Sequence, residues 1–205
     1  GIEELLDAGY AAEVVELAEE ALGLVEKAVE SCDDSDGSLG GILENLQDLH
    51  FEACRKARPD PEALADRLFQ IEMESGFDVF HGAAERYASV LGPAGLAAYR
   101  RLAEERWSDI RPLGPGEKGR SGAAGRFRIT AVMAALARVS GDVEALVAVQ
   151  KRDLSTPYDF LTIAETYGKT GKGDLAIEWA EKGVAAFPDR PDPRLTEFLA
   201  DRYLG

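Results

Sequence analysis

The sequence predicts an all-α fold, in which antiparallel helix pairs form a tetratricopeptide-like α-solenoid. Apolar residues recur at three- and four-residue steps through most of the 205 residues, and no segment alternates like a β-strand. A helix-pair repeat pattern occupies the C-terminal end. With 45% hydrophobic and 30% charged residues, the composition is that of a folded chain rather than a disordered acidic tail.

The first half of the chain is expected to hold five helices. Each follows an apolar stripe and is bounded by turn-forming Gly, Pro, Asp or Ser residues. Asp60 is predicted to cap the third helix, and Pro61 to occupy its first position, where a missing N–H costs nothing. The expected helices cover residues 14–29, 39–57, 61–75, 78–91 and 93–110.

A long loop is expected at residues 111–125, which are rich in Gly, Pro and charge and are the best candidate for a domain boundary. It would be a flexible connector between an N-terminal helical-repeat half, residues 1–110, and a C-terminal tetratricopeptide-like half, residues 126–205. The two halves could also form one continuous solenoid. Helices in the second half are expected near residues 126–139, 142–151, 157–169, 172–187 and 193–204.

The C-terminal segment carries the tetratricopeptide pattern most clearly. In that pattern, small residues let two helices cross closely and large residues fill the space between them. An ordinary helical hairpin with coincidental glycines is the alternative interpretation. The matching positions are Phe160, Ile163, Ala164, Tyr167, Gly171, Ala176, Gly183 and Pro188.

Several turn segments resemble one known group of proteins. They are Asp34-Ser35-Asp36-Gly37, Arg58-Pro59-Asp60-Pro61, Phe77-Asp78-Val79-Phe80-His81-Gly82-Ala83, Leu96-Ala97-Ala98-Tyr99-Arg100, Ser140-Gly141-Asp142-Val143, Ala186-Phe187-Pro188-Asp189-Arg190-Pro191-Asp192 and Phe198-Leu199-Ala200-Asp201. Together they are similar to the uncharacterised helical region that follows a SWIM-type zinc finger in some bacterial proteins. The finger needs Cys-x-Cys and then Cys-x-His, which this sequence lacks. The resemblance therefore implies that zinc and any nucleic-acid contact lie outside these residues.

Charge and cysteine content exclude several functions. The formal charge of −15 and a pI near 4.6 argue against direct binding of nucleic acid or an anionic membrane, because phosphates are bound by clustered Lys and Arg. No apolar run approaches the roughly 18 residues of a membrane span. Two cysteines, Cys32 and Cys54, suit a reducing cytoplasm. Because the sequence begins at Gly1 without Met, in mid-pattern, we expect a fragment of a longer protein.

Three local patterns touch on chemistry, and each has a simpler interpretation. Residues 114–121 follow the spacing of a phosphate-binding P-loop, but Arg120 replaces its lysine and no strand precedes it. The acidic turn at residues 33–37 resembles part of a calcium loop without the final glutamate. His50 and Cys54 have the spacing of zinc ligands but no companions in sequence. We expect no catalytic residue, cofactor or metal, although a metal role for the last two patterns stays open.

The predicted function is a non-catalytic scaffold for protein–protein interaction. Its partner would be a protein or peptide, or the remainder of its own chain, and the oligomeric state is not set by the sequence. The alternative is an accessory helical region of a nucleic-acid-associated zinc-finger protein, with the binding outside this chain. The groove of a helical repeat is lined by the first helix of each pair, here by Tyr158, Leu161, Glu165, Lys169, Arg194, Glu197 and Asp201.

Overall fold

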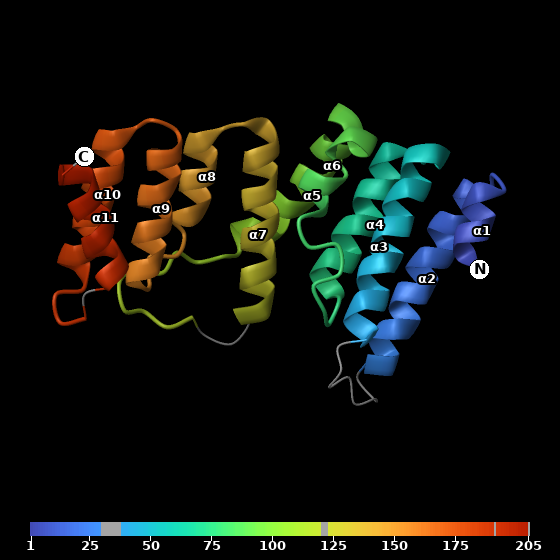
Figure 1. Cartoon of the computed structure of the whole chain (residues 1–205), viewed down its shortest axis with the longest axis horizontal. Coiled ribbons are helices and arrows are strands. Elements are labelled where there is room, and N and C mark those ends of the chain that lie inside the picture. The colour runs from blue at the N-terminus through green and yellow to red at the C-terminus, as the bar shows by residue number, and fades with distance from the viewer. Residues whose placement is uncertain (30–37, 120–122, 191, 205) are drawn as a thin grey trace. The chain divides into compact units, whose positions relative to one another are not determined.

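The computed structural model describes residues 1–29, 38–119, 123–190 and 192–204 (Figure 1). Over these residues the chain forms helices α1 to α11 and no strand, apart from an isolated bridge between Leu113 and Asp153. The prediction of an all-α fold built of packed helix pairs is therefore confirmed. The chain divides into two compact units, Gly1–Ala103 and Glu104–Gly205.

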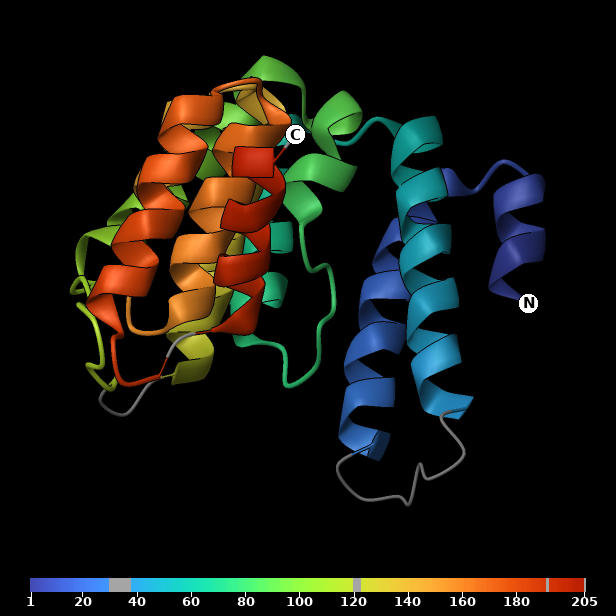
Figure 2. The same ribbon diagram turned by 60° about the vertical axis from the view of Figure 1, so that its left-hand side comes forward.

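The N-terminal unit is organised around an antiparallel hairpin of α2 and α3, which pack along their length (Figure 2). Val14, Ala18 and Leu22 of α2 and Ala53 of α3 are almost completely buried, so the main apolar stripe of each helix faces the interior. The elements of this unit are α1 (Ile2–Asp7), α2 (Ala11–Val29), α3 (Ser38–Ala57), α4 (Pro61–Glu74), α5 (Ala83–Arg86) and α6 (Ala88–Ser108).

Helix α4 begins where the sequence places it. The Asp60 side chain accepts a hydrogen bond of 2.9 Å from the Ala63 N–H, and Pro61 occupies the first turn. The helix predicted over residues 78–91 is wrong in its first part. Phe80 and Gly82 have positive φ angles of 55° and 75°, so the chain turns there and α5 starts only at Ala83.

The break predicted at Gly92-Pro93 is present as a kink inside α6. Gly92 has φ 57° and ψ −169°, a conformation favoured only by glycine, and Pro93 cannot donate a helical hydrogen bond. Three residues later, α6 passes the start of α4 very closely. A Cβ atom on Gly95 would lie 2.7 Å from the Pro61 carbonyl oxygen, so only glycine permits this crossing.

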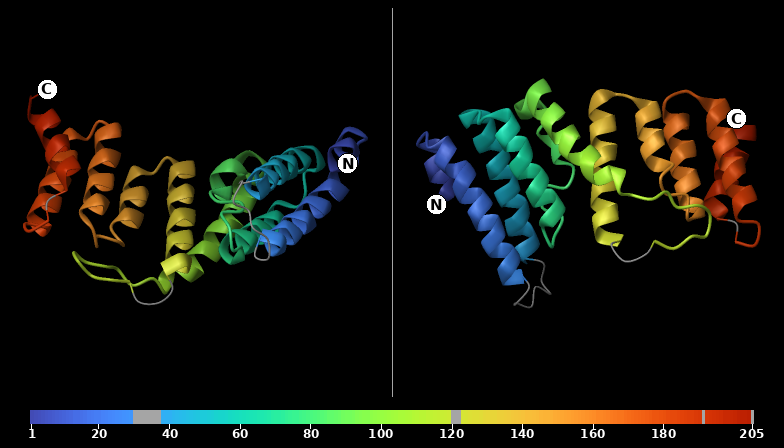
Figure 3. Two further views of the ribbon diagram at one scale, coloured as in Figure 1. Left: turned by 60° about the horizontal axis from the view of Figure 1, so that its bottom comes forward. Right: turned by 180° about the vertical axis from the view of Figure 1, so that it is seen from behind.

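The C-terminal unit contains successive antiparallel helices, which lie side by side (Figure 3). Their starts are fixed by local caps. The Ala145 N–H donates to Asp142 at 2.9 Å at the start of one helix, and Thr156 and Asp159 bond reciprocally at another. After the last part of α6, the elements are α7 (Ala123–Ser140), α8 (Val143–Gln150), α9 (Pro157–Lys169), α10 (Gly173–Ala186) and α11 (Pro193–Leu204).

Most residues of the repeat pattern form the core of α9 and α10, while Gly171 and Pro188 are exposed outside these helices. Ile163, Ala164 and Ala176 are fully buried. The small residue at Gly183 is required because a Cβ atom there would lie 2.7 Å from the Cβ of Phe160 and 2.9 Å from the Cδ1 of Leu195. Gly183 is thus the point at which α9, α10 and α11 come closest together.

The loop predicted as a flexible connector is anchored in its described part. Leu113 is buried, donates to the Arg152 carbonyl and accepts from the Leu154 N–H, both at 2.9 Å. The Gly116 N–H donates to the Ser155 carbonyl at 3.1 Å. These bonds attach the loop to the α8–α9 connection. The two units divide within α6 rather than at the predicted loop.

Substituting alanine for Gly183 should destabilise the C-terminal unit by about 1–3 kcal/mol, because the added methyl group overpacks the crossing of three helices. A Cβ atom on Gly173, also in α10, meets no atom within 4 Å. Gly173→Ala is therefore the control, and should leave stability within about 1 kcal/mol of wild type. Urea unfolding followed by circular dichroism measures both; equal stability of the two variants would contradict the close crossing.

Candidate functional site

The predicted binding residues lie on α9 and α11, and the structure brings part of the set together. The guanidinium of Arg194 lies 4.9 Å from the centre of the Tyr158 ring. About half of Tyr158 (53%) remains exposed. A cation over an aromatic face is attracted by the ring quadrupole. Tyr158 and Arg194 therefore form a joined, exposed surface at the starts of two neighbouring helices.

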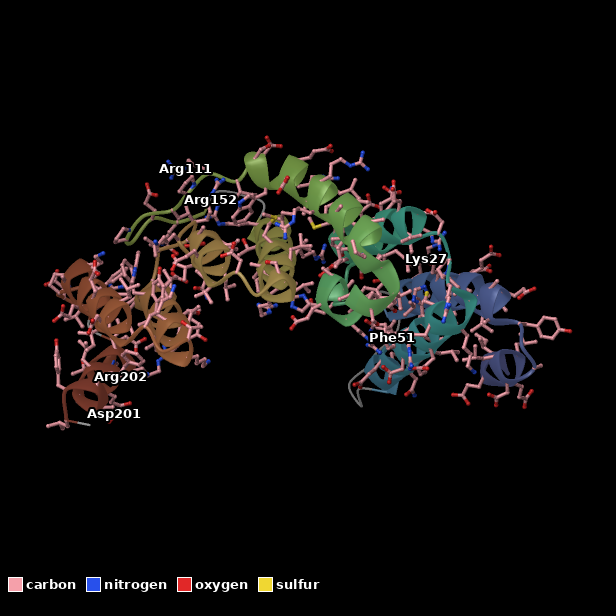
Figure 4. The ribbon with its side chains drawn as sticks, turned by 90° about the horizontal axis from the view of Figure 1, so that it is seen from above. Lys27, Phe51, Arg111, Arg152, Asp201 and Arg202 are labelled. Carbon is pink, nitrogen blue, oxygen red and sulfur yellow. The ribbon has the colours of Figure 1, made fainter. Side chains whose placement is uncertain are left out.

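Charged side chains continue this surface. Arg194 pairs with Asp192 at 2.6 Å, and Lys169 pairs with Glu165 at 3.8 Å. The hydrogen bond and charge of Asp192 raise the pKa of Arg194, with smaller contributions from Tyr158 and Glu165. Arg194 therefore lies within the electrostatic field of Glu165, across the two helices. Glu197 and Asp201 are exposed on α11, with Asp201 near its end (Figure 4).

Leu161, predicted to line the groove, is instead a core residue. Only 4% of it is exposed, and it belongs to a buried cluster with Ala164, Ala180 and Leu195. The physical reason is that α11 packs on this side of α9 and covers Leu161 with Leu195. Leu161 is therefore removed from the predicted surface, which leaves Tyr158, Glu165, Lys169, Arg194, Glu197 and Asp201.

Arg202 belongs to the same region, and sequence analysis missed it. Its guanidinium lies 5.1 Å from the centre of the Phe198 ring. A Cβ atom on Gly168 would lie 2.5 Å from Nη2 of Arg202, so α11 lays this side chain against α9 (Figure 4). A glycine inside a helix costs about 1 kcal/mol relative to alanine. The glycine at position 168, inside a predicted helix, was therefore the sequence signal that another group approaches the helix closely there.

The basic residues around the connecting loop make internal bonds. Arg126 donates to the carbonyl oxygens of Arg111 at 2.7 Å and Arg152 at 2.8 Å, and it pairs with Asp153 at 3.1 Å. The Arg152 guanidinium lies 4.9 Å from the Trp107 ring centre. Arg111 and Arg152 lie in the same region in Figure 4. Arg126 and Arg152 thus hold the loop against the helices.

A buried polar network lies in the N-terminal unit, centred on His50. Its Nδ1 atom is 2.8 Å from the Tyr87 hydroxyl and its Nε2 atom is 3.1 Å from Oε1 of Glu19, which also accepts from Arg67 at 3.1 Å. His50 and Tyr87 are fully buried. Burial would raise the pKa of Glu19, but His50 and Arg67 outweigh burial and lower it. Glu19 is therefore a carboxylate acceptor, so Nε2 of His50 donates to it.

Cys54 lies beside this network without entering it as a reactive group. Its sulfur is 3.8 Å from both ring nitrogens of His50. Burial, assisted by the Glu19 charge, raises the pKa of the thiol to about 12, so Cys54 is protonated and a poor nucleophile. Across the described part of the chain, no three or more His, Cys, Asp or Glu residues gather as metal ligands would. The His50–Cys54 spacing is here that of two packed side chains on one face of α3.

Glu72 is the second buried acidic group of this unit. It is 3% exposed, accepts a hydrogen bond of 2.7 Å from the Gly82 N–H, and accepts another from the Tyr99 hydroxyl. Burial raises the pKa of Glu72 although these hydrogen bonds act in the opposite direction. The carboxyl group connects α4 to the start of α5 and to α6.

The structure describes only part of the other two sequence patterns, the segment with P-loop spacing and the acidic turn. In the segment with P-loop spacing, the Gly114 N–H donates to Glu117 at 2.8 Å, and Glu117 pairs with Arg111 at 3.2 Å. The Glu117 carboxylate thus occupies the Gly114 N–H, which in a P-loop would be free to bind a phosphate group. Arg120 and Ser121 lie outside the described residues, as does the acidic turn at residues 33–37.

The sequence matches a family of unknown function, DUF6880, over residues 2–198, and the chain belongs to that family. No curated protein and no solved structure matches it. Among the described helices, none combines the length and apolar character required to cross a membrane.

Replacing Glu72 with glutamine should change how stability depends on pH. Because burial raises the pKa of Glu72 in the folded state, the folded protein retains a proton that the unfolded chain releases from about pH 4.5 upward. The wild-type free energy of unfolding therefore loses this contribution as pH rises through the folded-state pKa. Glu72→Gln cannot ionise, so its stability relative to wild type should increase as pH rises.

Urea unfolding at a series of pH values between about 4 and 7 measures this difference. Glu62→Gln is the control, because Glu62 is an exposed carboxylate on the same helix. Parallel stability curves for wild type and Glu72→Gln would contradict a raised pKa at Glu72.

Proposed function

We propose that this member of a family of unknown function is a non-catalytic scaffold that binds a protein or peptide on the exposed face of α9 and α11. The observation that carries the proposal is the stacked pair Tyr158 and Arg194. Tyrosine and arginine are the residue types enriched at the energetic centres of protein interfaces. Here both are exposed and already held together, so little side-chain freedom is lost when a partner binds.

The scaffold would be a tetratricopeptide-like solenoid. The small residues Ala164, Ala176 and Gly183 lie at the contacts between helices, and α9, α10 and α11 follow one another as neighbours. In such repeats the first helix of each pair lines the binding surface. The positions of Tyr158 on α9 and Arg194 on α11 fit that role.

The charge of this surface favours a partner segment with both basic and apolar residues. Glu165, Glu197 and Asp201 supply carboxylates, while Tyr158 supplies an apolar ring. Glu165 places a carboxylate where a carboxylate-binding tetratricopeptide groove uses Asn, so capture of an acidic C-terminus is disfavoured. Complementary charge would mainly set the association rate and the choice of partner.

The resemblance to a region behind a SWIM-type zinc finger adds a specific form of this proposal. In it, the partner is the remainder of the same protein, and any nucleic-acid contact lies outside this chain. Two of the resembling segments act here as helix starts, since Asp60 caps α4 and Asp142 caps α8. A buried, protonated Cys54 is compatible with the reducing cytoplasm that we propose as its location.

Selection of a phage-displayed random peptide library on the immobilised chain tests the surface. Enriched peptides should lose about tenfold or more in affinity for the variant Tyr158→Ala/Arg194→Ala, because truncating central interface residues typically costs more than 1 kcal/mol each. Glu165→Lys/Glu197→Lys should weaken binding of basic peptides. Fluorescence anisotropy with the synthesised peptides gives the affinities.

Ile42→Ala is the control, because Ile42 is an apolar residue exposed at 44% that lies on α3 in the N-terminal unit. It should leave the affinities unchanged. Peptides that bind Tyr158→Ala/Arg194→Ala as tightly as wild type would remove α9 and α11 from the proposal. A library from which no peptide is enriched would count against the scaffold function itself.

A further inference from the structure

The negative charge of this protein is concentrated at one end of the sequence. Residues 1–54 contain 15 of the 38 acidic residues but one of the 23 basic residues, Lys27. This stretch therefore holds a formal charge of −14 out of the total of −15. The remaining residues are nearly neutral. Helices α1 and α2 and most of α3 belong to this acidic stretch.

Helix α2 presents a second apolar stripe besides the one buried against α3. Tyr10, Leu17 and Leu24 are 53%, 37% and 60% exposed, and each is separated from the next by seven residues. Seven residues are almost two helical turns, so the three side chains lie along one line of the helix. The partly buried Ala21 and Ala28 fill the intervening turns. We call these five residues the α2 stripe.

The α2 stripe lies on the side of the helix turned away from α4. Glu19 and Glu26 face α4, because they bond to Arg67 and Ser75 respectively. Each follows a stripe leucine by two residues, which is about 200° around a helix. Helix α1 precedes α2 in the chain and also contacts it (Figure 2).

Carboxylates border the α2 stripe. Glu13 and Glu20 are exposed and each precedes a stripe leucine by four residues, so each lies beside that leucine on the helix surface. Glu16 is also exposed, and it lies further around the helix from the α2 stripe than Glu13 and Glu20. Lys27 continues the line of Glu13 and Glu20 at the far end of the helix. On α3 the acidic groups are partly compensated, since Asp48 and Glu52 pair with Arg86 and Arg55.

We propose that the α2 stripe docks an amphipathic, basic helix of a partner protein. A helix whose apolar residues recur at three- and four-residue steps would lie along Leu17 and Leu24, and Lys or Arg on its flanks would meet Glu13 and Glu20. This surface is independent of Tyr158 and Arg194, so either proposal can fail without the other.

Charge complementarity decides the occupant. A second copy of the chain would bring an equal, unbalanced negative charge against Glu13 and Glu20, which opposes self-association through the α2 stripe. Nucleic acids and anionic membranes are repelled for the same reason. A basic helix is the partner that covers the exposed leucines and also neutralises the surrounding carboxylates.

The test uses three labelled peptides, each as long as α2, which has 19 residues. The first is a Lys/Leu peptide with leucines in a heptad pattern, the second is a scrambled peptide of the same composition, and the third has Glu in place of Lys. Fluorescence anisotropy at physiological salt should show binding of the first peptide to wild type, at least about tenfold weaker binding of the second, and no binding of the third.

Leu17→Gln/Leu24→Gln leaves the charge unchanged and should weaken binding of the Lys/Leu peptide about tenfold or more. Both leucines are at least one-third exposed, so the variant should keep the wild-type circular dichroism spectrum. Glu13→Lys/Glu20→Lys, which retains the leucines, should weaken binding and reduce its dependence on salt. Ile42→Gln is the control, because Ile42 is an exposed apolar residue of α3 that lies outside the α2 stripe, and this variant should bind the peptide as wild type does.

Three outcomes would overturn the proposal. Equal affinity for the ordered and scrambled peptides would mean that charge alone drives binding. Unchanged affinity of the leucine variant would mean that the peptide binds elsewhere. Light scattering that showed a dimer of wild type, lost in Leu17→Gln/Leu24→Gln, would assign the stripe to self-association instead.

Discussion

A pair of antiparallel helices leaves apolar surface exposed to water unless another helix packs against the pair, and this constraint governs the packing of both units. Each pair must therefore be packed against the next, and its helices must approach closely enough to exclude water. Gly183 and Gly95 are placed where that approach is tightest, since a single methyl group would collide with a neighbouring helix at either position. The loop that follows α6 is also packed against the helices. Leu113 is buried there, and its backbone hydrogen bonds attach the loop to the α8–α9 connection.

Two buried polar side chains, His50 and Glu72, form hydrogen bonds between different helices of the N-terminal unit. His50 joins α3 to α2 through Glu19 and to Tyr87, and Glu72 joins α4 to the Gly82 turn and to α6. His50 and Glu72 both have hydrogen-bond partners, which is the condition under which burial of polar atoms is tolerated.

The sequence allowed the helical elements to be predicted well where local signals act alone. Asp60 caps α4 as expected, and six of the eight residues of the repeat pattern are buried. It failed where distant residues decide. The helix predicted from residue 78 is interrupted because Phe80 is buried and its N–H is bonded to Gln47 at 2.7 Å, a contact with no local signature. For the binding surface, Tyr158 and Arg194 were found, but burial of Leu161 depends on how α11 crosses α9, which periodicity does not specify.

The His50 network is part of the interior packing and keeps Cys54 buried and protonated. Thiol labelling of Cys54 tests it most directly, in the Cys32→Ser variant so that one thiol remains. We predict no reaction with an aromatic disulfide reagent while the protein is folded, because Cys54 is 0% exposed and protonated, and immediate reaction once urea unfolds the chain. Rapid labelling of the folded protein would contradict the claim, because it would require an accessible thiolate next to His50.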